Sequence, residues 1–269
     1  MIDMPIVLNE RVDDLAVLLA QSQRMGVPEL ADAHFPTHGN RRGLSLGWVI
    51  GIWLSHILSE ADHRLNHVQS WVERRLHSLC RCTGLSVTAL DFSDDRLADV
   101  LSALADDDQW QTFEEVLTQR LVRVYDLTPQ RVRADSTSAS GHWPITEDGL
   151  FQLGLSKDHR PDLPQVKIML SSLDPLGLPV ATQVVSGQRA DDPLYVPAIN
   201  AVRQALARRG LLYIGDCKMA AAPTRAHVHL GGDFYLCPLS QRQLPADGLT
   251  SYLAPVWTEP TRRLDGHLS

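Results

Sequence analysis

Two aspartates stand where a carboxylate could do chemistry. Asp135 follows the run QRVRA and precedes the small hydroxylated residues STSAS, and Asp216 follows the apolar run LLYIG and precedes CKMAA. Each sequence reads as a buried strand that ends in an acid. Two carboxylates on neighbouring strand ends can share a hard cation such as Mg²⁺, which prefers oxygen ligands. The sequence therefore predicts a divalent metal site at Asp135 and Asp216.

Metal ions held in this way serve phosphodiester chemistry, because they activate a water and stabilise the leaving 3′ oxygen. The alternative for either aspartate alone is a turn or cap residue. The stretch between the two aspartates is long enough for two further strands and a helix, so the second acid can return beside the first.

The elements that must position these acids differ between the two halves of the chain. From Val12 to about Leu127 apolar residues recur at helical spacing, and Ser93 is the expected N-cap of the segment DDRLADVLSAL. The apolar stripes are Val12, Leu15, Leu18 and Leu19; Leu97, Val100, Leu101 and Leu104; and Phe113, Val116, Leu117 and Leu121. The first half is therefore predicted to be mainly α-helical.

From Pro129 onward short β-rich runs appear, namely RVRADST, QVKIMLSSL, LPVATQVV, LLYIGD and DFYLCPL. The tetrapeptide DPLG at 174–177 indicates a hairpin turn, and residues 196–210 read as a helix with Gly210 at its C-cap. Three strands, a crossover helix and a further strand predict an α/β layer with one mixed sheet.

Bulk composition limits the function classes. The net charge of −7 means that any contact with nucleic acid must come from local basic patches. The four cysteines match no zinc spacing and indicate reduced thiols. The N-terminus lacks the features of a signal peptide, and the apolar run 43–58 is too short for a membrane helix. A cytoplasmic protein with no membrane role is expected.

The segments QRVRADSTSASGHW, FQLGLSKDHRPDLPQVKIML, LPVATQVVSGQRADDP and LLYIGDCKMAA occur in this order. Together they resemble the DDE transposases of bacterial insertion sequences, in the group with a β-rich insertion inside the catalytic domain. The resemblance covers roughly residues 40–240, and SKDHRPDLPQ is its most specific part. It implies an α/β fold with an RNase H-like mixed sheet and flanking helices, preceded by a mainly helical N-terminal region. It also implies that Asp135, on the first strand, and Asp216, on the fourth, hold Mg²⁺ or Mn²⁺.

The chain departs from the family at the third acid. Family members carry a Tyr-x2-Arg-x3-Glu-x6-Lys signature on a late helix, and none of the five tyrosines here has Arg three residues on. Glu259, the last glutamate, stands beside Pro260 and is not expected to be the missing ligand. Three regions are expected: 1–128, a helical and possible DNA-binding region; 129–240, the first part of the catalytic core; and 241–269, the start of a truncated insertion.

Basic residues supply the expected contacts with DNA phosphates. The candidates in the second half are Lys157, His159 and Arg160. The alternative interpretation is that these residues belong to an ordinary polar loop. The candidates in the Arg- and His-rich segment 63–82 are Arg74 and Arg75. The alternative interpretation is that this segment forms a solvated surface that pairs with the acidic segment 91–115. His63 and His67 stand four residues apart, but a polar helix face is favoured over a metal site.

Three functions remain open at this point. The first is a transposase-type protein that acts on insertion-sequence ends by metal-dependent cleavage and strand transfer, but is catalytically incomplete in this chain. The second is a non-catalytic regulator that binds DNA or a transposase. The third is a non-functional gene remnant. The expected partners are DNA and, as a further option, a second copy in a homodimer.

Overall fold

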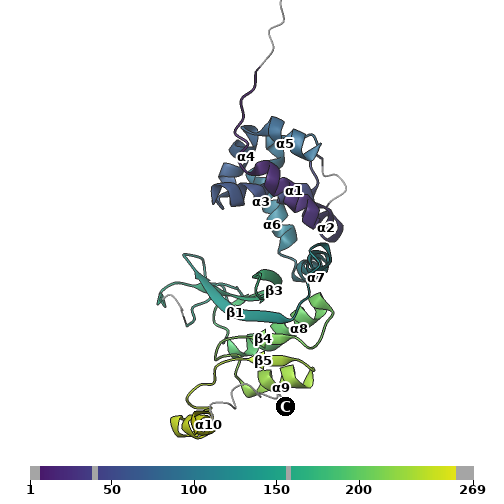
Figure 1. Cartoon of the computed structure of the whole chain (residues 1–269). Helices are drawn as coiled ribbons and strands as arrows, with labels where there is room; N and C mark the ends of the chain where they lie inside the picture. Colours follow the sequence, from purple (N-terminus) through teal and green to yellow (C-terminus); the bar gives the residue numbers. More distant parts are fainter. Residues whose placement is uncertain (1–6, 38–41, 156–158, 259–269) are drawn as a thin grey trace, which may run out of the picture. The chain divides into compact units, whose positions relative to one another are not determined.

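The computed structural model describes residues 7–37, 42–155 and 159–258, and it divides the chain into two compact units (Figure 1). The first unit is Met1–Thr128 and the second is Pro129–Ser269.

The first unit is built of helices around one very apolar helix, α3 (Leu46–Glu60). Because α3 is apolar on nearly all sides, it lies in the interior, and α1, α2, α4 and α6 contact it. Ser45 caps its N-terminus by accepting a hydrogen bond from the Trp48 backbone N–H. The other helices are α1 (Leu15–Met25), α2 (Val27–His34), α4 (Leu65–Glu73), α5 (Leu76–Thr83), η1 (Ala89–Phe92), α6 (Asp94–Leu104) and α7 (Asp107–Val124).

Most of the predicted helical stripes point into the core of this unit. The buried members are Leu15, Leu19, Leu97, Val100, Phe113 and Leu121. Ser93 is the N-cap of α6, as predicted, and accepts from the Arg96 backbone N–H. Val12 and Leu101 are exposed, contrary to the prediction. Val12 precedes the first turn of α1, and Leu101 lies on the outer face of α6.

The second unit contains a five-stranded mixed sheet with the strand order β3-β2-β1-β4-β5. Strands β1, β2 and β3 are antiparallel neighbours, whereas β4 and β5 run parallel to β1. Helix α8 connects β3 to β4 and packs against β2 and β3, and α9 packs against β5 and α8 (Figure 1). The predicted mixed α/β sheet with flanking helices is therefore confirmed. The bounds are β1 (Arg131–Ser140), β2 (Gln165–Leu173), β3 (Leu178–Ser186), η2 (Asp192–Leu194), α8 (Tyr195–Leu206), β4 (Leu212–Ile214), α9 (Ala222–Leu230), β5 (Phe234–Leu236) and α10 (Ala246–Thr258).

Two turns differ in how well the sequence predicted them. The DPLG turn joins β2 to β3 in an antiparallel hairpin, as expected, with Gly177 at a φ of +67°. Gly210 is not the C-cap of α8, because the helix already ends at Leu206 and Ala207 caps it at a φ of +47°. Gly210, at a φ of +74°, instead lies in the turn that leads into β4.

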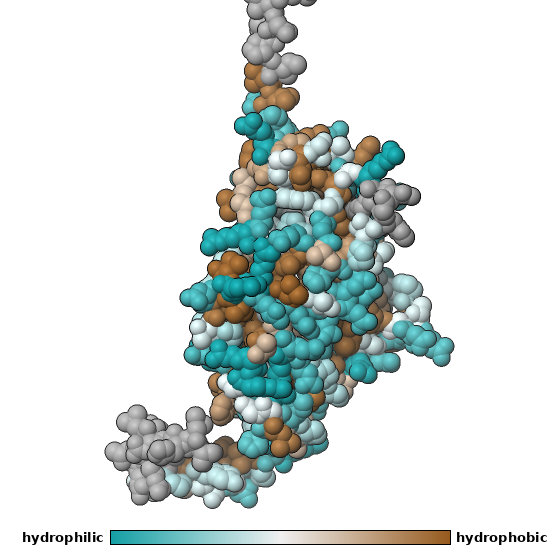
Figure 2. Space-filling view, turned by 90° about the vertical axis from the view of Figure 1, so that its right-hand side faces the viewer, coloured by the Kyte–Doolittle hydropathy of each residue, from teal (hydrophilic) through white to brown (hydrophobic). Residues whose placement is uncertain are grey.

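On the face shown in Figure 2, hydrophilic side chains predominate and the hydrophobic ones form separate spots. Among the described residues, no helix combines the length and the apolar character that crossing a membrane requires.

Candidate functional site

Asp135 lies in the middle of β1 and not at its end, which corrects the prediction. The hydroxylated run after Asp135 stays in the sheet because β2 pairs with it as far as Ser140. Strand β4, however, pairs only with Arg131–Arg133. Asp135 therefore stands just beyond the point where β1 loses its neighbour on that side, and its side chain is exposed while those of Ala134 and Ser136 are buried.

Asp216 stands at the matching position after β4. Arg133 and Ile214 are partners in the parallel register, and each aspartate follows its strand's partner residue by two positions. Side chains two apart on a strand share a face. The register therefore directs both carboxylates to the same edge of the sheet, where β4 ends. After Asp216 the chain makes a turn and enters α9 at Ala222.

The hydrogen bonds of the two aspartates leave one oxygen of each open. Asp135 Oδ1 accepts from the Ser136 backbone N–H at 2.8 Å. Asp216 Oδ1 accepts from the Tyr195 hydroxyl at 2.6 Å and from the Lys218 backbone N–H at 2.9 Å. In the described part of the chain neither Oδ2 receives a hydrogen bond. Two exposed carboxylates, each with one open oxygen, fit Mg²⁺ or Mn²⁺, which bind through one or two carboxylates and keep several waters.

Tyr195 is a residue of this site that the sequence reasoning missed. It begins α8, its side chain is buried, and its hydroxyl meets Asp216 from a segment about 20 residues away along the chain. Burial, the hydrogen bond to Asp216 and the negative charges of Asp216 and Asp135 raise the pKa of Tyr195 far above its ordinary value. The charges of both aspartates thus act on this one hydroxyl.

The described residues contain no group of three or more His, Cys, Asp or Glu side chains arranged to hold a metal ion. Asp135 and Asp216 are therefore a pair of candidate ligands. Glu259 lies outside the described residues, so the structure says nothing of it.

The predicted DNA-contacting residues of the second unit lie in the connection between β1 and β2. Lys157 falls outside the described residues, whereas His159 and Arg160 are exposed. Arg160 makes a two-pronged ion pair with Asp162, at 2.9 and 2.7 Å, and this pair lowers the pKa of Asp162 to about 2. The guanidinium is thus at the surface, but a DNA phosphate would have to compete with Asp162 for it.

In the helical unit the two predicted arginines have different surroundings. Arg74 is exposed. Arg75 is buried, with its guanidinium 3.0 Å from Glu60, 3.6 Å from Asp13 and 4.7 Å from the centre of the Trp71 ring. A phosphate contact needs an accessible guanidinium, so Arg75 is assigned to the stability of this unit and not to DNA binding.

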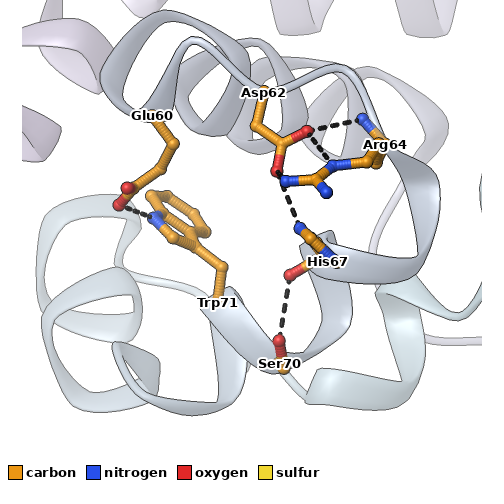
Figure 3. Close-up of polar contacts among 6 residues, drawn as sticks. All are labelled: Glu60, Asp62, Arg64, His67, Ser70 and Trp71. Carbon is orange, nitrogen blue, oxygen red and sulfur yellow. Dashed lines mark hydrogen bonds and ion pairs between the residues drawn. The ribbon is translucent and has the colours of Figure 1, made fainter.

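The loop before α4 and the start of α4 contain a polar cluster that includes Arg64 and His67 of the Arg- and His-rich segment 63–82 (Figure 3). Asp62 accepts from the Arg64 side chain at 2.9 Å and contacts His67 Nδ1 at 2.7 Å. These contacts lower the pKa of Asp62 well below its ordinary value, with the Arg64 hydrogen bond as the largest cause. His63 precedes α4, which begins at Leu65, so His63 and His67 do not form a pair along one helix. Arg64 pairs with Asp62, and Arg75 pairs with Glu60 and Asp13, rather than with the acidic segment 91–115.

His56 makes the stability of the helical unit depend on pH. It is 1% exposed, lies edge-on to Trp71, and its Nδ1 has no hydrogen-bond partner among the described residues. Burial lowers its pKa below the ordinary 6.5, against the opposing charges of Asp62 and Glu60 and with the help of Arg75 and His67. The unfolded chain therefore takes up this proton first as the pH falls. The free energy of unfolding should then drop by up to about 1.4 kcal/mol per pH unit below the unfolded pKa, until the folded pKa is reached.

Urea unfolding followed by tryptophan fluorescence at pH 7.5, 6.5 and 5.5 measures this effect. His56→Leu is expected to unfold with a weaker pH dependence than the unaltered chain, while His159→Leu, at an exposed position, serves as the control. Equal pH dependence in all three proteins would contradict this role of His56.

Comparisons with known proteins give no family assignment, since no family model and no curated protein matches the chain. Among solved structures, a piggyBac transposase synaptic complex with hairpin DNA is similar with a TM-score of 0.39 and 12% identity, over 86% of this chain. This chain spans about half of that protein, 51% of its length. A Mos1 transposase paired-end complex with the left transposon end has a TM-score of 0.30 and 7% identity, covering 91% of this chain and 85% of the Mos1 chain. A Mos1 mariner paired-end complex with Mn has a TM-score of 0.28 and 9% identity, covering 85% of this chain and 78% of the Mos1 chain. At such values the functional assignment has to come from the residues of this chain.

Proposed function

We propose that this chain is a transposase-type protein of the DDE kind, with an RNase H-like core, acting on the DNA ends of an insertion sequence. The observation that carries the proposal is the placement of Asp135 and Asp216 at one sheet edge. Asp135 lies on β1 and Asp216 follows the adjacent parallel strand β4, each two residues beyond the register pair Arg133 and Ile214. The order of segments that resembles the transposases in sequence supports it, because the first and fourth strands are the ones that carry the acids.

In this proposal Asp135 and Asp216 would hold the metal ion, because each has one carboxylate oxygen, Oδ2, that accepts no hydrogen bond from the described residues. When bound, Mg²⁺ or Mn²⁺ supplies Lewis-acid activation of a water and of the phosphodiester. The residues of the chain keep the site in place: Ser136 N–H fixes Asp135, and Tyr195 and Lys218 N–H fix Asp216. Neither aspartate acts as a covalent nucleophile.

Arg160 and its neighbour Asp162 provide a test of DNA binding. Arg160→Ala is expected to reduce the slope of log affinity against log salt by about 1, since one phosphate contact is lost. Asp162→Asn should act in the opposite direction and raise the affinity, because it removes the carboxylate charge that competes with a DNA phosphate for the Arg160 guanidinium. Fluorescence anisotropy with a mixed-sequence duplex at four salt concentrations measures both effects.

The control for that experiment is Asp148→Asn, which removes the same charge from the same connection. If Asp162→Asn and Asp148→Asn raise the affinity equally, the effect is one of net charge and the specific role of Arg160 is contradicted. If the unaltered chain does not bind duplex DNA at 50 mM salt, the proposed function itself fails.

A second candidate function is that of a DNA-binding regulator without catalysis. The pairing of only two candidate ligands among the described residues favours it. Incubation of a duplex carrying insertion-sequence ends with Mg²⁺ separates the two. Cleavage that disappears in Asp135→Ala supports the enzyme, and binding without cleavage that survives loss of both aspartates supports the regulator.

A further inference from the structure

Tyr195 connects the buried interior of the second unit to the candidate metal site. Its side chain is 1% exposed, yet its hydroxyl donates to Asp216, whose side chain is at the surface. The oxygen that accepts this bond, Oδ1, also accepts from the Lys218 backbone N–H. Two donors thus converge on one oxygen, and Oδ2 is the atom left for a cation.

The ring of Tyr195 is fixed by close packing under the chain that leads to Asp216. A Cβ placed on Gly215 would lie 3.1 Å from Tyr195 Cε1 and 2.5 Å from Met219 Sδ. Gly215 therefore allows the backbone of the Asp216 turn to lie directly against the ring. The hydroxyl has little freedom to move away from Asp216.

The backbone of Tyr195 is anchored to the sheet by an ion pair. Tyr195 follows η2, and Asp191 directly before η2 pairs with Lys167 of β2 at 2.7 Å. Both side chains are nearly buried, at 5% exposed for Lys167 and 12% for Asp191. A buried charge pair is costly to break by removing one partner, so it holds this turn in one position.

We infer that Tyr195 is the positioning residue of Asp216: it fixes the carboxylate so that Oδ2 alone is presented to a divalent cation. This inference rests on the metal-binding role proposed for Asp216. Hydrogen bonds to metal-ligating groups typically contribute 10–100-fold to metal affinity, because they orient the ligand before the ion arrives.

The test is the affinity of the full chain for Mn²⁺, measured by electron paramagnetic resonance of the free ion. Tyr195→Phe keeps the ring and removes only the hydroxyl, and it is expected to weaken Mn²⁺ binding about 10-fold. Tyr213→Phe is the matched control: Tyr213 is equally buried, lies on β4, and its hydroxyl contacts neither aspartate. It is expected to leave the affinity unchanged.

The outcomes separate the inference from the proposed function. Mn²⁺ binding that is lost in Asp216→Asn but unchanged in Tyr195→Phe would overturn the inference and leave the metal site standing. Absence of Mn²⁺ binding by the unaltered chain would overturn the proposed function and the inference with it.

Discussion

Replacing Arg203 with methionine is expected to lower the free energy of unfolding by about 3–5 kcal/mol, the usual cost of leaving a buried charge without its partner. Arg203 Nε donates to Asp233 Oδ2 at 2.8 Å, and the Asp233 side chain is completely buried. Domains are stable by only about 5–15 kcal/mol, so the variant is expected to lose a large part of the stability of the second unit.

This ion pair matters because of the elements that it joins. Arg203 belongs to α8, and Asp233 directly precedes β5 and accepts from the Leu211 backbone N–H at 3.0 Å, next to the start of β4. The pair therefore connects the helix that carries Tyr195 to the two strands at the parallel side of the sheet. Its loss should loosen the segment that ends in Asp216.

A double variant distinguishes the loss of a contact from the burial of an unpaired charge. Arg203→Met with Asp233→Asn removes both charges and keeps an acceptor for the Leu211 N–H. We expect it to recover a large part of the stability lost in Arg203→Met, because no unpaired charge is then buried. Urea unfolding of the full chain measures all variants, with Arg160→Met, which breaks an exposed ion pair, as the control. Equal stability of Arg203→Met and Arg160→Met would contradict the argument.

Local sequence patterns were sufficient for the elements that short-range rules determine. The DPLG turn specifies a hairpin, Ser93 specifies a helix start, and the apolar segment around Val49 and Ile52 specifies a buried helix, because each depends on neighbours within a few residues. The same rules misplaced the end of β1. Its length is set by pairing with β2, which lies some 30 residues further along the chain.

The contacts that decide the roles of side chains join residues far apart in the sequence, and local sequence patterns do not predict such contacts. Arg75 looked like a surface arginine until the structure placed it against Glu60 and Trp71. Nothing in the local sequence marked Tyr195, since its partner Asp216 lies 21 residues further along the chain, just after β4. The two aspartates could be paired in advance because each follows a strand-like run, and because the order of segments resembles a family in which such strands are neighbours.

Asp135→Asn and Asp216→Asn are each expected to weaken Mn²⁺ binding at least about 10-fold, because even the outer hydrogen-bond partners of metal ligands contribute 10–100-fold. Asp148→Asn, with the same change in charge at an exposed position of the β1–β2 connection, should bind as the unaltered chain does. The thermal midpoint supplies a second readout, since a ligand that binds only the folded state raises it by mass action. Mn²⁺ should therefore raise the midpoint of the unaltered chain and of Asp148→Asn, but not of the two site variants.

Without metal the same substitutions are not expected to lower the stability of the chain. Two carboxylates at one sheet edge repel each other, and no cation of the chain makes an ion pair with either of them among the described residues. Replacing one with asparagine removes that repulsion, so Asp135→Asn and Asp216→Asn are expected to be as stable as the unaltered chain or more so in the presence of EDTA. A site kept for binding is one that costs stability when empty. If either substitution instead destabilises the metal-free chain and leaves Mn²⁺ binding intact, that aspartate supports the fold, and the metal site assigned to this sheet edge is contradicted.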